Sequence, residues 1–247
     1  MRSIARIIPL VALMAIFYSC SNNNALSIKG DPEAVEMAQA MMDSLGGRSH
    51  WEKLKSLYVR TFIYISGGNQ NYISEQWIEL DKPRVMYRKT NDAGSELQIV
   101  DGNDGWMIRD NVIDLLSSES ITALLTWHQH YFIRFLKIIA TGGENYEIKK
   151  REFSRFDLYD KDKFIGGVEL DEKNYPVRYF DKLSTRLQVS SVISKWGEYQ
   201  GYKYPLEVHP QENLSILKTD YWNPGELDAE QAFKISFNPN TMLERMK

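Results

Sequence analysis

Cysteine is almost absent from this chain, because Cys20 is the only one among its 247 residues. A disulfide bond within the chain is therefore excluded. An excess of positive charge is absent too: 30 Lys and Arg stand against 33 Asp and Glu, which gives a formal net charge of −3. Nucleic-acid binding depends on a basic surface, so we expect no nucleic-acid partner.

Recognisable catalytic and metal-binding motifs are also missing. The sequence has no G-x-S-x-G elbow, no phosphate-binding glycine loop and no H-E-x-x-H pair. His128 and His130 are two residues apart, which places them on different sides of a helix and prevents them from sharing a metal. We expect no enzymatic activity, no cofactor and no metal site. If the protein is an enzyme, we expect an envelope hydrolase that uses His128 or His130.

The first twenty residues have the pattern of an export signal. Arg2 and Arg6 precede an apolar run over 7–18, and the small Ser19 stands directly before Cys20. This resembles a bacterial lipoprotein signal, in which the cysteine receives acyl chains such as palmitate and becomes the mature N-terminus. We expect a signal peptide over 1–19, a lipidated end and tether over 20–30, and one domain over 31–247. The alternative is an ordinary secretory signal with an incidental cysteine.

Most of the domain has the rhythm of strands, and its 6 Trp, 14 Tyr and 10 Phe favour the same assignment. A first helix is capped by Asp31, carries Pro32 at its first position and ends at Gly46 and Gly47. Eleven to thirteen strands follow, joined by short turns such as DGNDG at 101–105. Pro205 indicates an edge strand or a bulge. A last polar stretch, NPGELDAEQAF, suggests a turn of helix near Phe233.

The stretch 117–143 is the one strongly helical apolar segment in the mature chain. Its apolar residues recur at helical spacing, at Ile121, Leu124, Leu125, His128, Phe132, Phe135, Leu136 and Ile139. We predict one helix across a curved sheet, as a lid or a central packing helix. It is too short and too interrupted to span a membrane. Arg134 and Lys137 reach either a lipid headgroup or, as we favour, water.

Short turns between successive strands imply an antiparallel sheet, and so many strands must curl. The predicted fold class is α+β, a curled antiparallel sheet with a helical lid over its concave face.

The order of these elements resembles the LolA/LolB-like family of outer-membrane lipoprotein-sorting proteins. The resemblance covers Pro32 to Phe237, and its motifs are a first helix ending in Leu-Gly-Gly, LKSLYVRTFIYI, WIELDKPRVMYR, ELQIVDGNDGWMI with Trp106, the apolar helix and YKYPLEV. It implies an incomplete barrel of about eleven strands that holds acyl chains of lipids or lipoproteins. Cys20 places the chain nearer the lipid-anchored members than the soluble carriers.

Six aromatic residues are the candidates for lining such a cavity: Trp77, Trp106, Trp127, Phe132, Phe135 and Trp196. The alternative for each is a place in a filled core. The expected function is that of an anchored envelope lipoprotein that binds a lipid or an acylated protein, in lipoprotein sorting or lipid transport. The rival interpretation is a scaffold lipoprotein with a solid core and an envelope protein partner. We expect it at the outer membrane, facing the periplasm.

Overall fold

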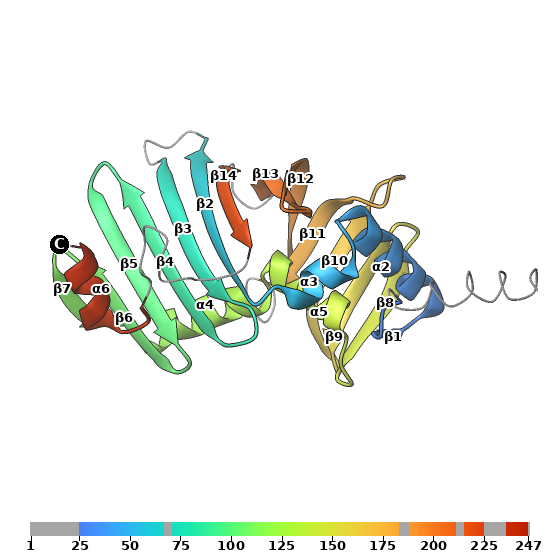
Figure 1. The fold of residues 1–247 in the computed structure, drawn as a ribbon, viewed down its shortest axis with the longest axis horizontal. Helices are drawn as coiled ribbons and strands as arrows, with labels where there is room; N and C mark the ends of the chain where they lie inside the picture. Colours follow the sequence, from blue (N-terminus) through green and yellow to red (C-terminus); the bar gives the residue numbers. More distant parts are fainter. Residues whose placement is uncertain (1–24, 67–70, 183–187, 211–214, 225–235, 247) are drawn as a thin grey trace, which may run out of the picture.

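The computed structural model describes residues 25–66, 71–182, 188–210, 215–224 and 236–246. The described residues form an α+β fold with five helices and one large sheet (Figure 1). The helices are α2 (Pro32–Ser44), α3 (Arg48–Lys53), α4 (Ser118–Gln129), α5 (Phe132–Thr141) and α6 (Pro239–Met246). Cys20 and the predicted signal peptide lie outside the described residues.

The sheet contains fourteen strands in the described part of the chain. They are β1 (Lys29–Gly30), β2 (Ser56–Ile65), β3 (Tyr72–Glu79), β4 (Arg84–Asn91), β5 (Gly94–Asp101), β6 (Asp104–Arg109), β7 (Val112–Leu115), β8 (Tyr146–Glu152), β9 (Arg155–Asp160), β10 (Lys163–Leu170), β11 (Pro176–Lys182), β12 (Gln188–Tyr199), β13 (Tyr202–Pro210) and β14 (Ser215–Pro224).

The strand order is β1-β8-β9-β10-β11-β12-β13-β14-β2-β3-β4-β5-β6-β7. All neighbouring pairs are antiparallel except β1 and β8, and the two ends do not pair, so the sheet is open. The predicted α+β class and mainly antiparallel sheet are confirmed. The predicted strand number is too low, because β1 has two residues and β7 four, both too short to leave a clear alternation in the sequence.

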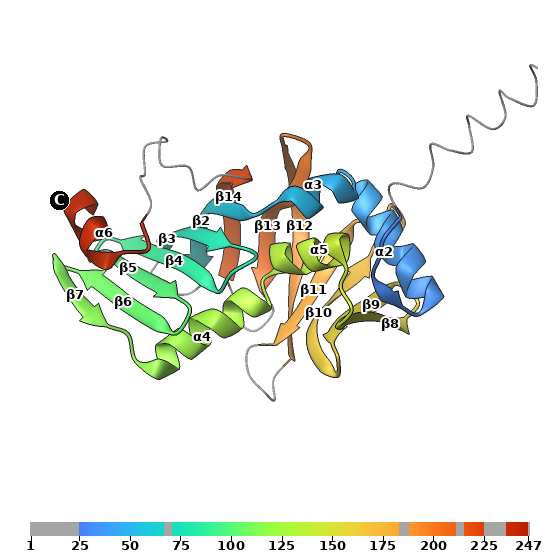
Figure 2. The same cartoon turned by 60° about the horizontal axis from the view of Figure 1, so that its bottom comes forward.

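The single helix predicted over 117–143 is wrong, because the chain breaks into α4 and α5 at His130 and Tyr131. Tyr131 has extended backbone angles, with φ −65° and ψ 131°. Tyr179 donates a hydrogen bond from its hydroxyl to the carbonyl of His130 at 2.6 Å, which supplies a partner at the break. Helix α4 packs against strands β4 and β5, whereas α5 contacts β10 and α3, so a straight helix could not reach both sites (Figure 2).

Helix α5 is the centre of the main core. Eight of its ten residues are buried, including Phe135, Leu136 and Ile139 at 0% exposure. A helix that is apolar on all sides must be covered on all sides. Helices α2 and α3 and the strands β8 to β13 supply that cover, as Figures 1 and 2 show. The first helix is confirmed at α2, with Asp31 at the N-cap position, but the Asp31 carboxylate accepts from the backbone N–H of Lys150 and does not cap the helix; α3 was not predicted.

Of the two cations of α5, Lys137 does not reach water as we expected, whereas Arg134 is partly exposed. Lys137 is 7% exposed, and its ammonium donates to the carbonyl of Glu52 at 3.2 Å and pairs with Asp81 at 3.2 Å. Arg134 donates to the carbonyls of Leu80 and Gln129. Both side chains therefore attach the helix to neighbouring elements.

A second, smaller core lies on the opposite face of the sheet. Trp77, Met86, Leu97, Ile99 and Ile108 are buried there beneath the C-terminal helix α6. The side chains of Phe237, Met242, Leu243 and Met246 pack on this cluster. Helix α6 was not predicted, and the predicted turn of helix near Phe233 lies outside the described residues. The sheet consequently has apolar cover on both faces, from different helices.

We predict that Gly105 is required where α4 lies on the sheet. A Cβ at this position would stand 2.6 Å from Cγ1 of Ile121 and 3.2 Å from Cβ of Leu116. Gly105→Ala should lower the free energy of unfolding by about 1–3 kcal/mol through overpacking, as measured by denaturant titration. The double variant Gly105→Ala with Ile121→Ala should lose less free energy of unfolding than the sum of the losses in the two single variants. Strictly additive losses would contradict this packing account.

Candidate functional site

The seam between β13 and β14 is a short junction in the middle of the sheet. These strands pair only at Glu207 with Lys218 and at Val208 with Leu217. Strand β12 shifts register opposite β13 near Pro205, and β14 shifts register opposite β2 after Thr219. The bulge that we predicted at Pro205 is confirmed. Bulges bend a strand and increase its twist, so the two strands separate beyond their short pairing.

A pocket of about 200 Å³ lies against this seam. One wall is the sheet, which contributes Val59, Thr61, Gln76, Tyr179, Asp181, Ser191, Ile193, Pro205, Val208, Leu217, Thr219 and Trp222. The other wall is the break between α4 and α5, which contributes Trp127, His130, Tyr131, Phe132 and Ile133. The pocket therefore lies between the sheet and the segment that we had predicted as a lid.

Aromatic rings form much of the wall and its support. Trp222 stacks on Tyr204 with ring centroids 4.9 Å apart and planes nearly parallel. Phe132 meets Tyr179 edge to face at 4.9 Å, and Trp127 lies 4.9 Å from Tyr131. Aromatic pairs of this kind stabilise the positions of their rings beyond what the burial of apolar surface contributes. The pocket is thus lined by ordered, mainly apolar surface.

Polar groups stand at defined places in the pocket. Nδ1 of His130 lies 2.5 Å from the carbonyl of Ile165, which makes it the donor nitrogen. Burial lowers the pKa of His130, and it also lowers the pKa of His128, whose Nε2 contacts the carbonyl of Glu79. Both rings are therefore neutral near pH 7. On the sheet wall, Thr61 pairs directly across the strands with Thr219.

The fold is similar to that of LolA superfamily proteins. An outer membrane lipoprotein-sorting protein domain from Vibrio parahaemolyticus aligns with a TM-score of 0.46 and 12% identity, over 85% of this chain and 98% of that chain. A LolA superfamily protein from Nitrosomonas europaea aligns with a TM-score of 0.46 and 11% identity, over 77% and 94%. A DUF1329 family protein from Desulfovibrio piger gives 0.35 and 11%, over 79% and 95%. No protein-family model and no curated protein matches the sequence.

Four of the six predicted aromatic residues lie at or near the pocket. Trp127 and Phe132 line it. Phe135 lies directly behind, with its ring 6.2 Å from that of Phe132 and no exposure. Trp196 also meets Phe132 at 6.2 Å and packs on Tyr175. The helix period indicated Phe132 and Phe135 as members of the apolar stripe, whereas Trp127 lies off that stripe and Trp196 belongs to strand β12.

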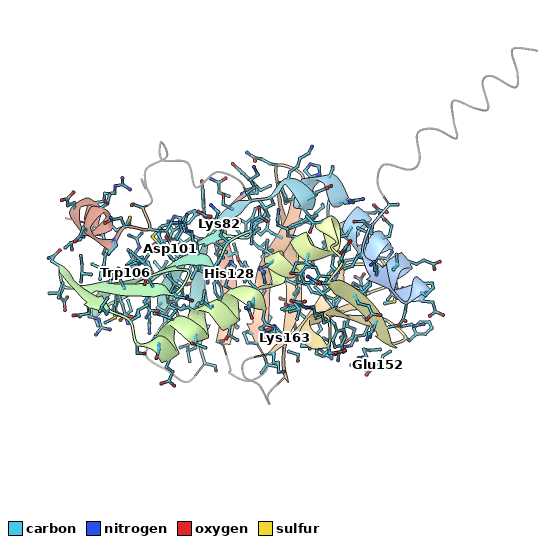
Figure 3. The ribbon with its side chains drawn as sticks, turned by 90° about the horizontal axis from the view of Figure 1, so that it is seen from below. Lys82, Asp101, Trp106, His128, Glu152 and Lys163 are labelled. Carbon is cyan, nitrogen blue, oxygen red and sulfur yellow. The ribbon has the colours of Figure 1, made fainter. Side chains whose placement is uncertain are left out.

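Trp77 and Trp106 lie in the other core, on the far face of the sheet. Trp77 stacks on Tyr58 at 5.0 Å, and Trp106 packs on the same cluster beneath α6. Figure 3 places Trp106 toward the end of the molecule opposite Glu152, with His128 between them. The residue directly before Trp77 in strand β3 is Gln76, and it lines the pocket. The strict alternation along β3 was the signal that separates the two faces.

The two aromatic residues that strands contribute to the pocket wall, Tyr179 and Trp222, were not among our candidates, and neither was Tyr131 at the helix break. Tyr179 and Trp222 each lie on a strand whose alternation is locally disturbed or short. A bulge stands just before Trp222, because the register with β2 shifts between Thr219 and Tyr221. A bulge is not visible in a simple period of two, so the sequence pattern would have pointed Trp222 to the wrong face.

One further polar group on the surface contains the residue types of a hydrolase. Nε2 of His209 contacts both Oγ of Ser194 at 3.0 Å and Oε1 of Glu207 at 3.1 Å. Hydrogen bonds from Lys195 and His209 lower the pKa of Glu207 to about 2. A Ser-His-acid triad needs the acid on the other ring nitrogen. The three residues therefore form a surface hydrogen-bond network.

Among the described residues, no three His, Cys, Asp or Glu side chains gather as a metal site requires. The helices in that part of the chain lack the length and apolar content needed to cross a bilayer. The pocket at the seam is the feature on which a function can be argued.

We predict that the two buried histidines make stability fall in weak acid. Their pKa values are lowered in the folded chain, so the unfolded chain binds more protons below about pH 6.5. The free energy of unfolding should be level near pH 8 and decline from about pH 7 to pH 5. The double variant His128→Gln with His130→Asn replaces each imidazole by an amide whose N–H can donate to the same carbonyl, of Glu79 and Ile165 respectively. Because an amide does not titrate, this variant should show a flatter decline of stability with falling pH. The surface variant His209→Gln should retain the decline of the wild type, and equal slopes in all three proteins would contradict the prediction.

Proposed function

We propose that this chain is an envelope lipoprotein that binds an acyl chain of a lipid or lipoprotein in the pocket at the β13–β14 seam. The observation that carries the proposal is the position of the pocket. It lies between a curved sheet and a broken helix, with Val59, Ile193, Val208 and Leu217 on one side and Phe132 and Ile133 on the other. Apolar pockets with a few placed polar groups are the usual form of small-molecule sites.

The size of the pocket determines what it holds. A cavity of about 150 Å³ holds benzene, so the present 200 Å³ accommodates part of an acyl chain. Each buried methylene contributes about 0.8 kcal/mol. A longer chain requires the α4–α5 break to move or continues along the concave face. The helix break is suited to movement because Tyr131 already has extended backbone angles. Binding and release then proceed by burial and exposure of apolar surface, without bond chemistry.

The sequence supplies the proposed location. Lipidation of Cys20 would attach the domain to a membrane by a short tether. The resemblance of the motif order to the lipid-anchored sorting proteins supports an outer-membrane site facing the periplasm. In this arrangement the partners are a lipid or an acylated protein, and lipoprotein sorting or lipid transport is the process served.

A scaffold role is the second candidate, and one observation favours it. Strand β7 is a free edge of the sheet, and its residues Val112 and Leu115 are 54% and 80% exposed. Exposed apolar edges are places where another chain can add a strand. A protein that works only through this edge has no use for the pocket at the seam.

The decisive measurement is mass spectrometry on a soluble form that begins at Ser21, native and after solvent extraction. We expect one acyl-bearing molecule per chain. Val208→Trp should fill the pocket and lower its occupancy at least tenfold, because the new indole takes the volume of the guest. Thr219→Met is a smaller change with the same expected direction.

The matched control is Val112→Trp, which adds the same indole to an exposed strand edge and should leave occupancy unchanged. Folding of each variant is checked by its unfolding transition. If the wild-type chain carries no acyl molecule and takes up none on incubation with lipids and acylated peptides, the scaffold role replaces lipid binding.

A further inference from the structure

The concave face of β3 to β5 continues from the pocket as a series of rows that the strand register defines. In the lowest row Ile78, Val85 and Val100 stand opposite one another and are fully buried on the core side. Two residues further along each strand, the same face carries Gln76, Tyr87 and Gln98. Because side chains alternate between faces, this second row lies directly beside the first.

The second row, hereafter the amide–phenol row, consists of Gln76, Tyr87 and Gln98. All three are partly exposed, and none carries a charge at neutral pH. Burial raises the pKa of Tyr87, so its hydroxyl stays protonated. Two interstrand spacings separate Gln76 from Gln98, about 10 Å. Gln76 also lines the seam pocket, so the row and the pocket form one continuous surface.

The two amides of this row are partly free to meet a guest, whereas the hydroxyl of Tyr87 already shares hydrogen bonds with the side chains of Tyr72 and Ser74. Nε2 of Gln76 donates to Oγ of Ser74 at 3.2 Å, and Nε2 of Gln98 donates to Oε1 of Glu96 at 2.7 Å. Each amide therefore keeps its oxygen and its second N–H. An amide or a phenol both donates and accepts hydrogen bonds, which fits a partner that does the same.

On β3 to β6 the charged groups of this face begin in the third row and are engaged with neighbours, while the wall of the seam pocket includes the carboxylate of Asp181. Lys89, Glu96 and Arg109 stand in register across β4, β5 and β6. Arg109 pairs with Glu96, and the ammonium of Lys89 lies 4.7 Å from the ring centroid of Tyr72. The concave face thus passes from apolar to uncharged polar to charged and paired.

We propose that the amide–phenol row binds the head of an amphiphile whose chain occupies the seam pocket, and that this head is uncharged and rich in hydroxyl groups, as in a glycosylated acyl lipid. This inference rests on the proposed function. A charged head brought onto partly buried amides without an opposite charge loses hydration that these groups do not restore. A hydroxyl-rich head exchanges its water for donors and acceptors in equal measure.

Three probes with the same eight-carbon alkyl chain separate the head from the chain: octyl glucoside, nonanoate and octyltrimethylammonium. Each is titrated by calorimetry, below its micelle-forming concentration, into the soluble chain from Ser21. The glucoside should bind at least tenfold more tightly than either charged probe. Gln76→Leu with Tyr87→Phe should remove most of this preference, at about fivefold for each lost hydrogen bond.

The control is Thr90→Val, which removes a hydroxyl from the same strand as Tyr87 on the opposite face, where Oγ1 of Thr90 contacts Ser95. It should leave all three affinities unchanged. If the three probes bind equally, or if a charged probe binds best, the head site is overturned while acyl binding stands. If none binds and no acyl molecule co-purifies, both proposals fail. Loss of glucoside preference in Thr90→Val as well would also overturn the site.

Discussion

The burial of α5 is the constraint on which the rest of this structure depends. A ten-residue helix with eight buried positions cannot lie on the surface of a flat sheet, because one side would remain in water. The strands β8 to β13 and the helices α2 and α3 therefore enclose it. This enclosure explains the break at His130 and Tyr131, since the chain must leave the enclosed helix to reach the other half of the sheet. It also explains why the ammonium of Lys137 donates to the carbonyl of Glu52 and pairs with Asp81.

The pocket arises where the two halves of the sheet meet. On one side the strands wrap around α5, and on the other they form the surface beneath α4 (Figure 2). The short pairing of β13 with β14 lets the sheet change direction at this place without losing its continuity. Pro205, which cannot donate to a ladder, stands at the same seam. A site at a place where the sheet already bends can change its opening with little loss of strand pairing elsewhere.

The sequence predicted local periods better than it predicted which elements meet. The first helix, the strand pattern and the DGNDG turn follow from short-range chemistry and are present. The break in the long helix was not predictable, because its cause is the distant Tyr179 and the shape of the sheet. In the site, helix spacing indicated the face of Phe132, whereas Trp127 lies off the predicted stripe and still lines the pocket. Trp77 was chosen as a candidate because it is aromatic. Side chains alternate along β3, so its neighbour Gln76 faces the pocket and Trp77 faces the opposite core.

The polarity of the concave face argues that it is more than an unfilled part of the core. A core that merely lacked volume would be lined by aliphatic residues, and closing it would stabilise the fold. Here the surface next to the pocket carries two amides and a phenol in register, which lose hydration when covered and gain nothing from apolar neighbours. The opposite face of the same strands carries the apolar cluster of Trp77, Met86, Leu97 and Ile99, on which α6 packs, and beside it the ion pairs of Arg88 with Glu75 and of Arg84 with Glu79 and Asp101. Strands β3 to β5 turn apolar residues toward α6 and turn amides toward the side of the pocket. This arrangement suits a guest that has both an apolar and a polar part.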